Sequence, residues 1–346
     1  MAMNQFYHEI AESANQVGGV WQELSGARIF ATGCTGFLGR WILAALLHAN
    51  RTHDLGLSIV CLSRDPDRFA SLCPGLAADP ALKLLAGDVR ACEFPDGPFT
   101  HVIHAAADTS AAADARPLEL ADTILVGARR VLDFAVRSGA RRLLLTSSGA
   151  VYGAQPADLA AMPETYEGAC STTDVRSNYA QSKRMAEQFC TIYHQQYGIE
   201  TVIARCFAFV GPFLDPFGHF AIGNFVRDAV RGGEIVVSGD GTPVRSFLYA
   251  SDAAVWLAVL LARGRGGTAY NVGSSEAISI GDLAKLVADT IPGAQGVRIL
   301  GAPQPGGFRS RYIPDTTRAR TELGLEPWIG LEESIRRYAG WVRTVA

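Results

Sequence analysis

The sequence lacks a long apolar run, a paired-cysteine motif and a basic cluster, and each absence excludes a class of protein. Its longest apolar stretch, Ala253–Ala262, has about half the length that a membrane-spanning helix needs. The N-terminus does not show the charged-then-apolar order of a secretory signal peptide. The seven cysteines include no CxxC pair, so neither a disulfide framework nor a zinc site is indicated. We therefore expect a cytoplasmic protein that has no membrane partner.

Charged residues are scarce as well, at 19% of the 346 residues, and the formal net charge is −3. No basic stretch could follow a phosphate backbone, so nucleic acid is not an expected partner. The seven histidines are spread out without the spacing of metal ligands, and no metal site is expected. With 48% apolar residues, the chain can build a packed core as two domains or as one large α/β unit.

What the sequence does contain is a regular alternation of short apolar runs and helical patterns. The expected strands are Arg28–Thr32, Ser58–Leu62, Leu82–Ala86, His101–Ala105, Arg141–Ser147, Glu200–Cys206 and Ala269–Val272. The expected helices are Leu38–Ala49, Leu118–Ser138 and Tyr179–Tyr197, with helical spacing also over residues 4–17. Nearly continuous apolar strands that alternate with helices predict a doubly wound parallel sheet, a Rossmann-type α/β fold.

The alternation ends after Gly211, where segments rich in glycine and proline follow. From this change we expect a division into three parts. They are an N-terminal helical extension over 1–25, a dinucleotide-binding Rossmann domain over 26–207 to which 246–273 returns, and a smaller substrate-binding lobe from 208–245 and 274–346.

A glycine-rich loop, residues 33–39 (GCTGFLG), follows the first expected strand and opens a helix. Glycine allows the backbone to turn sharply and to approach a pyrophosphate closely. The charge of the pyrophosphate is then met by free N–H groups at the helix N-terminus. In this strand–turn–helix context, the loop predicts dinucleotide binding.

Tyr179 and Lys183 stand four residues apart at the start of an expected helix, which puts them on one face. A phenol with a pKa of about 10 is a poor base at neutral pH, and a nearby ammonium lowers that pKa. Residues 146–153 (TSSGAVYG) end the preceding strand, where a hydroxyl can bond the same substrate oxygen. A YxxxK pair alone would more often be an ordinary helix surface. Together with the glycine loop and the strand end, it predicts an oxidoreductase site.

These motifs resemble those of the extended short-chain dehydrogenase/reductases, the NAD-dependent epimerase/dehydratase family that modifies nucleotide sugars. The GxxGxxG spacing of the loop is characteristic of the superfamily, and the resemblance covers residues 26 to about 335. Further matches are the segments 87–89, 104–107, 239–249 and 270–273. The resemblance implies that Tyr179 is the general acid/base and that Ser148 orients the reacting oxygen. It also implies that Lys183 lowers the pKa of the phenol and holds the nicotinamide ribose.

The resemblance also implies cofactor and substrate contacts. The cofactor-binding residues would be Gly33, Thr35, Gly36, Phe37, Leu38, Gly39, Ser63, Arg64, Asp88, Val89, Ala105, Ala106, Ala107, Tyr179 and Lys183. The substrate-binding residues would be Ser148, Asn224, Arg245 and Arg311. The forked guanidinium of Arg245 suits the diphosphate of a nucleotide-diphosphate sugar. For Asn224, Arg245 and Arg311, the alternative role is loop capping or a surface ion pair. Asp108 is a further candidate for a substrate contact.

Departures from the family pattern narrow the reaction. After the catalytic hydroxyl, sugar 4,6-dehydratases carry Asp-Glu and decarboxylating relatives also carry a Glu, whereas this sequence has Gly149 and Ala150. Neither residue can carry a proton, which favours simple hydride transfer at a carbinol. Ala208 and Ile124 replace asparagines that are usual in the family, so the substrate pose is expected to differ.

A second departure concerns the cofactor. NAD-using members end the second strand with an Asp that binds the ribose hydroxyls, but here the strand ends in Ser63-Arg64-Asp65. A hydroxyl and an arginine suit the 2′-phosphate of NADP. The alternative is that Asp65 turns inward and binds the ribose. NADP is therefore the expected cofactor and NAD the alternative.

The expected function is NAD(P)-dependent oxidoreduction at a sugar carbon, the 4-position, of a nucleotide sugar. An NADPH-dependent 4-ketoreductase is the first interpretation and a 4-epimerase with retained cofactor the second. A sugar dehydratase, a reductase of a non-nucleotide carbonyl and a non-catalytic NADP-binding regulator remain as further alternatives. Extra apolar residues on the expected helices 118–138 and 179–197 predict a homodimer. They are Leu125, Val126, Leu132, Met185, Phe189 and Ile192.

Overall fold

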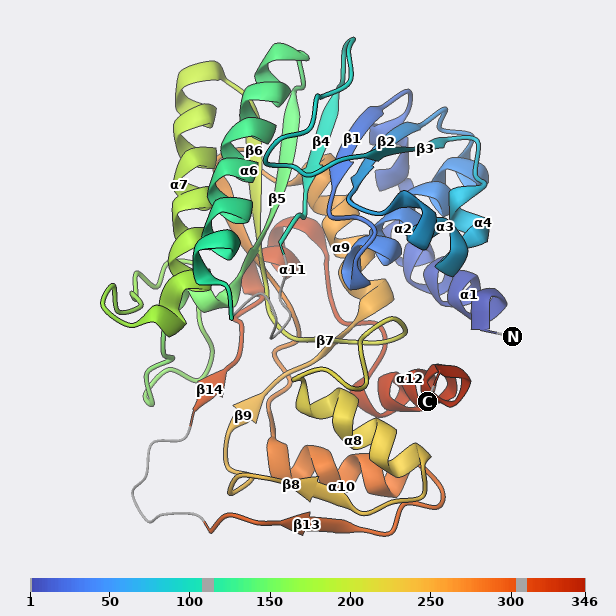
Figure 1. Ribbon diagram of the computed structural model, residues 1–346, viewed down its shortest axis with the longest axis vertical. Helices are drawn as coiled ribbons and strands as arrows, with labels where there is room; N and C mark the ends of the chain where they lie inside the picture. The colour runs from blue at the N-terminus through green and yellow to red at the C-terminus, as the bar shows by residue number, and fades with distance from the viewer. Residues whose placement is uncertain (1, 108–114, 303–309, 346) are drawn as a thin grey trace.

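The computed structural model describes residues 2–107, 115–302 and 310–345. At its centre is a seven-stranded sheet in the order β11-β6-β5-β4-β1-β2-β3 (Figure 1). The strands are β1 (Arg28–Thr32), β2 (Ser58–Ser63), β3 (Leu82–Ala86), β4 (His101–His104), β5 (Arg142–Ser148), β6 (Glu200–Cys206) and β11 (Thr268–Val272). All neighbouring strands are parallel. The predicted doubly wound α/β fold is confirmed, and the strand order reverses between β1 and β4.

Helices cover both faces of this sheet, because successive strand residues point to opposite sides. Ile29 and Ala31 of β1 pack in one core with α1 (Ala2–Ala14), α2 (Phe37–His53) and α9 (Ala250–Arg263). Phe30, between them, packs in the other core with α6 (Pro117–Arg137) and α7 (Asn178–Tyr197), which lie side by side in Figure 1. The sheet is thus buried on both faces, as its apolar strands predict.

The N-terminal segment is tied to the rest of the protein by buried polar groups. Ser13 donates a hydrogen bond to Asp252 Oδ1 at 2.7 Å, and Tyr249 donates to Glu9 Oε2 at 2.6 Å. Asp252 also accepts from the backbone N–H groups of Trp328 and Ile329, both at 2.9 Å. Burial raises the pKa of Asp252 to about 6. Helix α1 and the following 3-10 helix η1 (Asn15–Leu24) therefore pack as part of the helical layer on α9.

A smaller lobe lies beyond the carboxyl ends of the central strands (Figure 1). Its strands are β7 (Phe209–Val210), β8 (Ile235–Val237), β9 (Val244–Arg245), β10 (Leu248–Tyr249), β12 (Ile278–Ser279), β13 (Val297–Ile299) and β14 (Arg311–Tyr312). Its helices are α8 (Ala221–Val230), α10 (Ile280–Thr290) and α12 (Leu331–Val345). Strand β9 pairs with both β12 and β14, and this pairing brings Arg245 of β9 next to Arg311 and Tyr312 of β14.

The remaining helical segments are short. They are α3 (Pro66–Leu72), α4 (Pro74–Ala77), α11 (Thr317–Leu323), η2 (Gly149–Tyr152) and η3 (Val175–Ser177). Across the described ranges, no helix combines the length and the apolar character that a bilayer span requires.

Candidate active site

The glycine loop turns tightly between the end of β1 and the start of α2. Gly33 has a φ of +74°, and a Cβ there would lie 2.3 Å from the carbonyl carbon of Ala105. At Gly39, a Cβ would lie 2.3 Å from Cys34 Cα. Gly36 precedes the first residue of α2, so the free N–H groups of this helix open onto the loop. A tight turn beside a helix N-terminus is the geometry that a pyrophosphate site requires, and dinucleotide binding at this loop remains a prediction.

The end of β2 lies against this loop. Ser63 donates a hydrogen bond to Thr35 Oγ1 at 3.3 Å. Asp65, the alternative ribose ligand, instead accepts from the N–H of Arg68 at 2.9 Å and caps the N-terminus of α3. This engagement as a helix cap disfavours the alternative role of Asp65.

Asp88, one of the predicted cofactor-binding residues, is brought beside the end of β2, because the Gly87 N–H donates to the Ser63 carbonyl at 2.9 Å. Arg90 donates to both carboxylate oxygens of Asp88, at 2.9 and 2.7 Å. These hydrogen bonds lower the pKa of Asp88 to about 2, and Arg64 contributes in the same direction. The carboxylate of Asp88 therefore lies near two guanidinium groups, those of Arg90 and Arg64.

The last three residues of β5 each make a different side-chain contact. The carbonyl of Thr146 accepts a hydrogen bond from Lys183 Nζ at 2.7 Å. Ser147 donates to Glu187 Oε1 at 2.5 Å. Ser148 accepts from the Ala150 N–H at 3.1 Å and lies 3.4 Å from the hydroxyl of Tyr312. Helix α7 and strand β14 therefore meet at the end of this one strand.

The side chain of Lys183 is buried, and its Nζ lies 5.9 Å from the centre of the Tyr179 ring. Burial lowers the pKa of this lysine to about 8, although the nearby Glu187 acts in the opposite direction. Tyr179 in turn lies close enough to Tyr312 to help raise the pKa of that phenol. The structure thus brings together the residues that the sequence predicts as catalytic, Ser148, Tyr179 and Lys183.

Three residues near the site were not predicted from the sequence. Glu187, one turn after Lys183, is buried and forms an ion pair at 2.7 Å with the partly buried Arg205. Phe207, just after β6, packs its ring 4.5 Å from the ring of Tyr312. Tyr312 directly follows Arg311 in the two-residue strand β14. Strand alternation could have indicated that Tyr312 and Arg311 point to opposite sides.

Phe207 also explains Gly149. A Cβ added at Gly149 would lie 2.6 Å from the ring of Phe207, which is closer than any real contact. A side chain cannot be added at this position unless the ring moves. The site therefore has no proton-carrying group at position 149, and the space for one is filled.

Apart from Ser148, the residues predicted to bind substrate lie in the smaller lobe. Arg245 lies opposite Tyr312 in the β9–β14 pair and donates to the carbonyls of Val244 and Ser310, at 2.9 and 3.2 Å. Burial lowers the pKa of Arg245. Arg311 donates to the carbonyl of Ala160 at 3.1 Å. Its Nε is buried and has no hydrogen-bond partner within the described part of the chain.

Asn224 behaves differently. Its side chain donates to the carbonyl of Gly218 at 3.2 Å and accepts from Arg227 at 2.9 Å. These bonds hold Asn224 within its own helix and the preceding loop, so its contact with a nucleotide remains a prediction. Asp108 lies outside the described residues.

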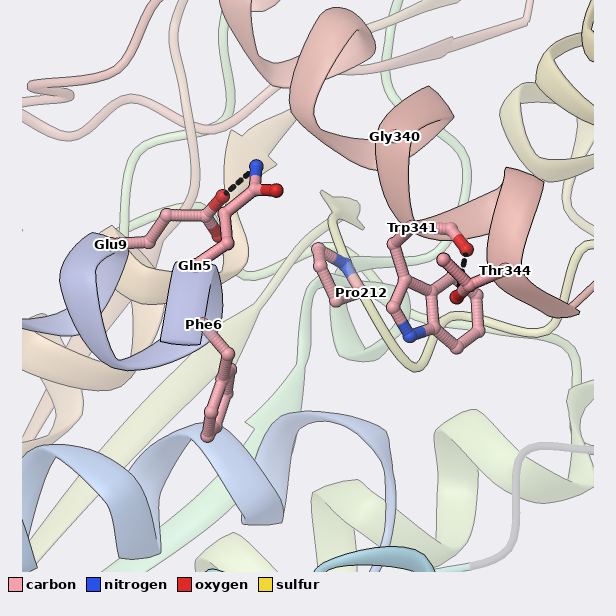
Figure 2. Close-up of a pocket in the computed structure, with 7 residues that line it drawn as sticks. All are labelled: Gln5, Phe6, Glu9, Pro212, Gly340, Trp341 and Thr344. Carbon is pink, nitrogen blue, oxygen red and sulfur yellow. Dashed lines mark hydrogen bonds between the residues drawn. The ribbon is translucent and has the colours of Figure 1, made fainter. Parts of the chain in front are cut away.

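A pocket of about 80 Å³ lies elsewhere, between α1 and α12 (Figure 2). It is lined by Gln5, Phe6, Glu9, Pro212, Gly340, Trp341 and Thr344. Gln5 donates to Glu9 at 2.8 Å on one wall, and Thr344 donates to the carbonyl of Trp341 at 2.7 Å on the other (Figure 2). None of the predicted site residues lines it, so it is not the candidate active site.

The chain is similar to known proteins over most of its length. The model of the NAD dependent epimerase/dehydratase family matches residues 29–273. UDP-glucuronic acid decarboxylase 5 of Arabidopsis thaliana is 35% identical over 219 residues, which are 63% of this chain and 62% of that relative. The match thus spans less than two thirds of the relative's length. UDP-glucuronic acid decarboxylase 6 of the same plant is 30% identical over 314 residues, 90% of this chain and 87% of that protein.

Among solved structures, the dTDP-glucose 4,6-dehydratase DesIV from Streptomyces venezuelae, with NAD and TYD bound, is similar to this chain. The similarity covers 92% of this chain and 97% of that one, with 27% sequence identity and a TM-score of 0.76. The family match extends from β1 through β11 and includes the glycine loop and the Ser148, Tyr179 and Lys183 positions. The chain therefore belongs to the NAD-dependent epimerase/dehydratase family.

Proposed function

We propose that this protein is an enzyme that transfers a hydride between NAD(P) and the 4-carbon of a nucleotide-diphosphate sugar, as an NADPH-dependent 4-ketoreductase. The observation that carries the proposal is the complete set of Ser148, Tyr179 and Lys183 beside a filled space at Gly149. The set can exchange one proton at one oxygen. Dehydration or decarboxylation would need a further proton-carrying group next to Ser148, and Gly149 and Ala150 do not supply one.

In the proposed reaction, the glycine loop and Lys183 would hold NADPH, which would supply the hydride that the carbonyl carbon of the sugar accepts. Tyr179 donates its proton to the carbonyl oxygen, so that a ketone becomes an alcohol. Ser148 donates a hydrogen bond to the same oxygen while charge develops there. The ammonium of Lys183 holds the nicotinamide ribose and favours the deprotonated form of Tyr179 that remains, until solvent returns the proton.

NADP is the proposed cofactor. Support comes from Ser63 at the end of β2, from Arg64 next to it, and from the use of Asp65 as the cap of α3. A carboxylate aimed at the ribose would repel a 2′-phosphate, whereas a guanidinium would bind it. NAD remains the alternative, because the similar dehydratase structure has NAD bound.

The proposed substrate is a nucleoside diphosphate linked to a sugar. Arg245 and Arg311 supply guanidinium groups on the paired strands β9 and β14. Arg245 is a neighbour of Tyr312, which in turn lies near Ser148 and Tyr179. Guanidinium groups bind phosphate oxygens through paired hydrogen bonds. We therefore propose that Arg245 binds the diphosphate.

A 4-epimerase is the second candidate. It would oxidise, turn and re-reduce the same sugar, and it needs only Ser148, Tyr179 and Lys183. An epimerase must retain its cofactor, because the hydride that it removes is the one that it returns. A ketoreductase consumes one NADPH for each product.

The difference in cofactor use is the basis of the test. With a 4-keto-6-deoxy nucleotide sugar, we expect NADPH oxidation that matches product formation one to one, followed at the nicotinamide absorbance band. In a parallel reaction without added cofactor, we expect no interconversion of UDP-glucose and UDP-galactose. Rapid interconversion there would contradict the ketoreductase and support the epimerase.

We also propose that a second copy of the chain packs on α6 and α7. Val126 and Met185 on these helices are 41% and 40% exposed, and Leu118 is 82% exposed. The prediction that Leu132 contributes to this face is wrong, because it is only 1% exposed and packs in the protein's own core. Met185→Glu should shift a dimer toward monomer in sedimentation at micromolar concentration. The matched Leu72→Glu, on exposed α3, should not, and a monomeric wild type would contradict the proposal.

A further inference from the structure

We propose that Tyr312 is a positioning residue that orients the hydroxyl of Ser148 toward the reacting oxygen. This inference rests on the proposed function, because it assigns Tyr312 a part in the same proton and hydride transfer. The sequence motifs give no role to Tyr312, because only its neighbour Arg311 is predicted to contact the substrate.

The position of Tyr312 supports this role directly. Its hydroxyl lies 3.4 Å from Ser148 Oγ and 3.4 Å from the carbonyl oxygen of Cys206. Its ring packs against Phe207 at 4.5 Å between ring centres. Burial raises the pKa of the Tyr312 phenol far above its usual value. The phenol therefore keeps its proton and acts as a hydrogen-bond donor.

The backbone around Tyr312 is held from two sides. The following residue, Ile313, donates its N–H to the buried side chain of Gln155 at 2.9 Å and accepts from the N–H of Met162 at 2.8 Å. On the other side, β14 pairs with β9, where Tyr312 lies opposite Arg245. These contacts fix the strand on which the tyrosine stands. The phenol is thus held in place by the fold and by the ring of Phe207.

The hydrogen-bonding capacity of Ser148 defines what Tyr312 can do for it. A serine hydroxyl has one hydrogen to donate and two lone pairs to accept with. The Ala150 N–H already fills one lone pair at 3.1 Å. When Tyr312 donates to the other, the hydrogen of Ser148 is free to be donated to the reacting oxygen.

The carbonyl of Cys206 offers Tyr312 a second acceptor. When the phenol donates to that carbonyl, Ser148 can instead donate its hydrogen to Tyr312 Oη, and the hydrogen then points away from the substrate. The distances from Tyr312 Oη to Ser148 Oγ and to the Cys206 carbonyl oxygen, both 3.4 Å, are long for hydrogen bonds. Hydrogen bonds in an active site often shorten when the substrate is bound. We infer that Tyr312 donates to Ser148 when substrate is bound.

The variant Tyr312→Phe tests this role, because it removes the hydroxyl and keeps the ring that packs on Phe207. The kcat for hydride transfer should fall about tenfold, the effect of one hydrogen bond in the transition state. KM and cofactor affinity should stay within about twofold, because the variant leaves Arg245 and the glycine loop intact. The matched control is Tyr338→Phe, which removes a buried hydroxyl that donates to the Leu214 carbonyl at 2.9 Å, and kcat should be unchanged.

A double-mutant cycle separates action through Ser148 from any other role. If Tyr312 acts only through Ser148, then adding Tyr312→Phe to Ser148→Ala should cause no further loss of kcat. Equal losses in both backgrounds would overturn the inference, as would a Tyr312→Phe enzyme with the wild-type kcat.

A crystal structure with bound cofactor provides a readout that does not depend on turnover. The wild type should show Ser148 in one rotamer with its Oγ within hydrogen-bond distance of Tyr312 Oη, and Tyr312→Phe should show more than one rotamer. A wild-type Ser148 turned away from Tyr312 would overturn the inference. If the wild type instead turns over no nucleotide sugar, the proposed function fails, and the rotamers of Ser148 still decide whether Tyr312 orients it.

Discussion

The ring of Phe207 occupies the space that a side chain at Gly149 would need, since a Cβ there would lie 2.6 Å from the ring. The ring in turn supports Tyr312 at 4.5 Å. The missing acid after Ser148 is therefore part of the packing of this site. Restoring an acidic residue at this position would need the ring to move, and the contact between Phe207 and Tyr312 would change with it.

Gly149→Ala should destabilise the protein through this contact. Adding a methyl group to a packed site costs about 1–3 kcal/mol, and the free energy of unfolding should fall by this amount in chemical denaturation. Gly330→Ala is the control, because a Cβ there meets nothing within 4 Å, and its stability should be near that of the wild type. If Gly149→Ala were as stable as the control, Phe207 would not be a barrier to side chains at this position.

Tyr179→Phe should reduce kcat by at least about 100-fold and leave cofactor affinity unchanged, because only the proton-transferring oxygen is removed. Lys183→Ala should reduce both kcat and cofactor affinity, since its ammonium serves Tyr179 and the ribose. Steady-state kinetics and calorimetric titration of NADPH measure the two effects. Comparable losses of cofactor affinity in both variants would mean that these roles are wrongly assigned.

Cofactor preference should depend on the end of β2. Replacing Ser63 by Asp together with Arg64 by Asn should shift the preference from NADP toward NAD. The variant loses a charge-assisted contact worth about 1.5–3 kcal/mol and gains a carboxylate that repels the 2′-phosphate. The ratio of the two dissociation constants measures the shift. A wild type that already binds NAD more tightly would contradict the assignment and would favour Asp65 as the ribose ligand.

Alkaline pH should weaken cofactor binding through Lys183. Burial lowers the pKa of this lysine from 10.5 to about 8, so the free enzyme loses the ammonium above that pH. NADPH affinity should therefore fall between about pH 7 and about pH 9.5, and Lys183→Met should bind weakly with little dependence on pH. A wild type whose affinity stays constant over this range would show that the ammonium is not needed for binding.

The lowered pKa of Lys183 affects protein stability in the opposite direction, so that stability rises with pH. Between about pH 8 and the pKa of an unfolded lysine, the unfolded chain binds more protons than the folded one. The contribution of Lys183 to the free energy of unfolding therefore rises with pH over this interval. Comparing denaturation of the wild type and Lys183→Met at both ends of the interval measures it.

The sequence by itself determined the elements of this fold. The strands predicted over Arg28–Thr32, Leu82–Ala86 and Glu200–Cys206 have the same bounds in the structure, and the other four central strands differ by at most one residue at either end. Such accuracy is expected where apolar strands alternate regularly with helices, because burial on both faces leaves a strong local pattern. The spacing of Tyr179 and Lys183 likewise follows from helix geometry alone.

Only the tertiary structure decided what surrounds these residues. Ser148 and Tyr312 are separated by 164 positions in the chain. In the sequence, Gly149 shows only that an acidic residue is absent, whereas the structure shows that the ring of Phe207 occupies the space of a side chain there. Leu132 has the same apolar character as Val126, yet one faces the core and the other solvent. Local periodicity shows which residues are apolar and which share one face of a helix or strand. Contacts between distant segments depend on how the sheet and the lobe pack, and no local sequence pattern encodes this packing.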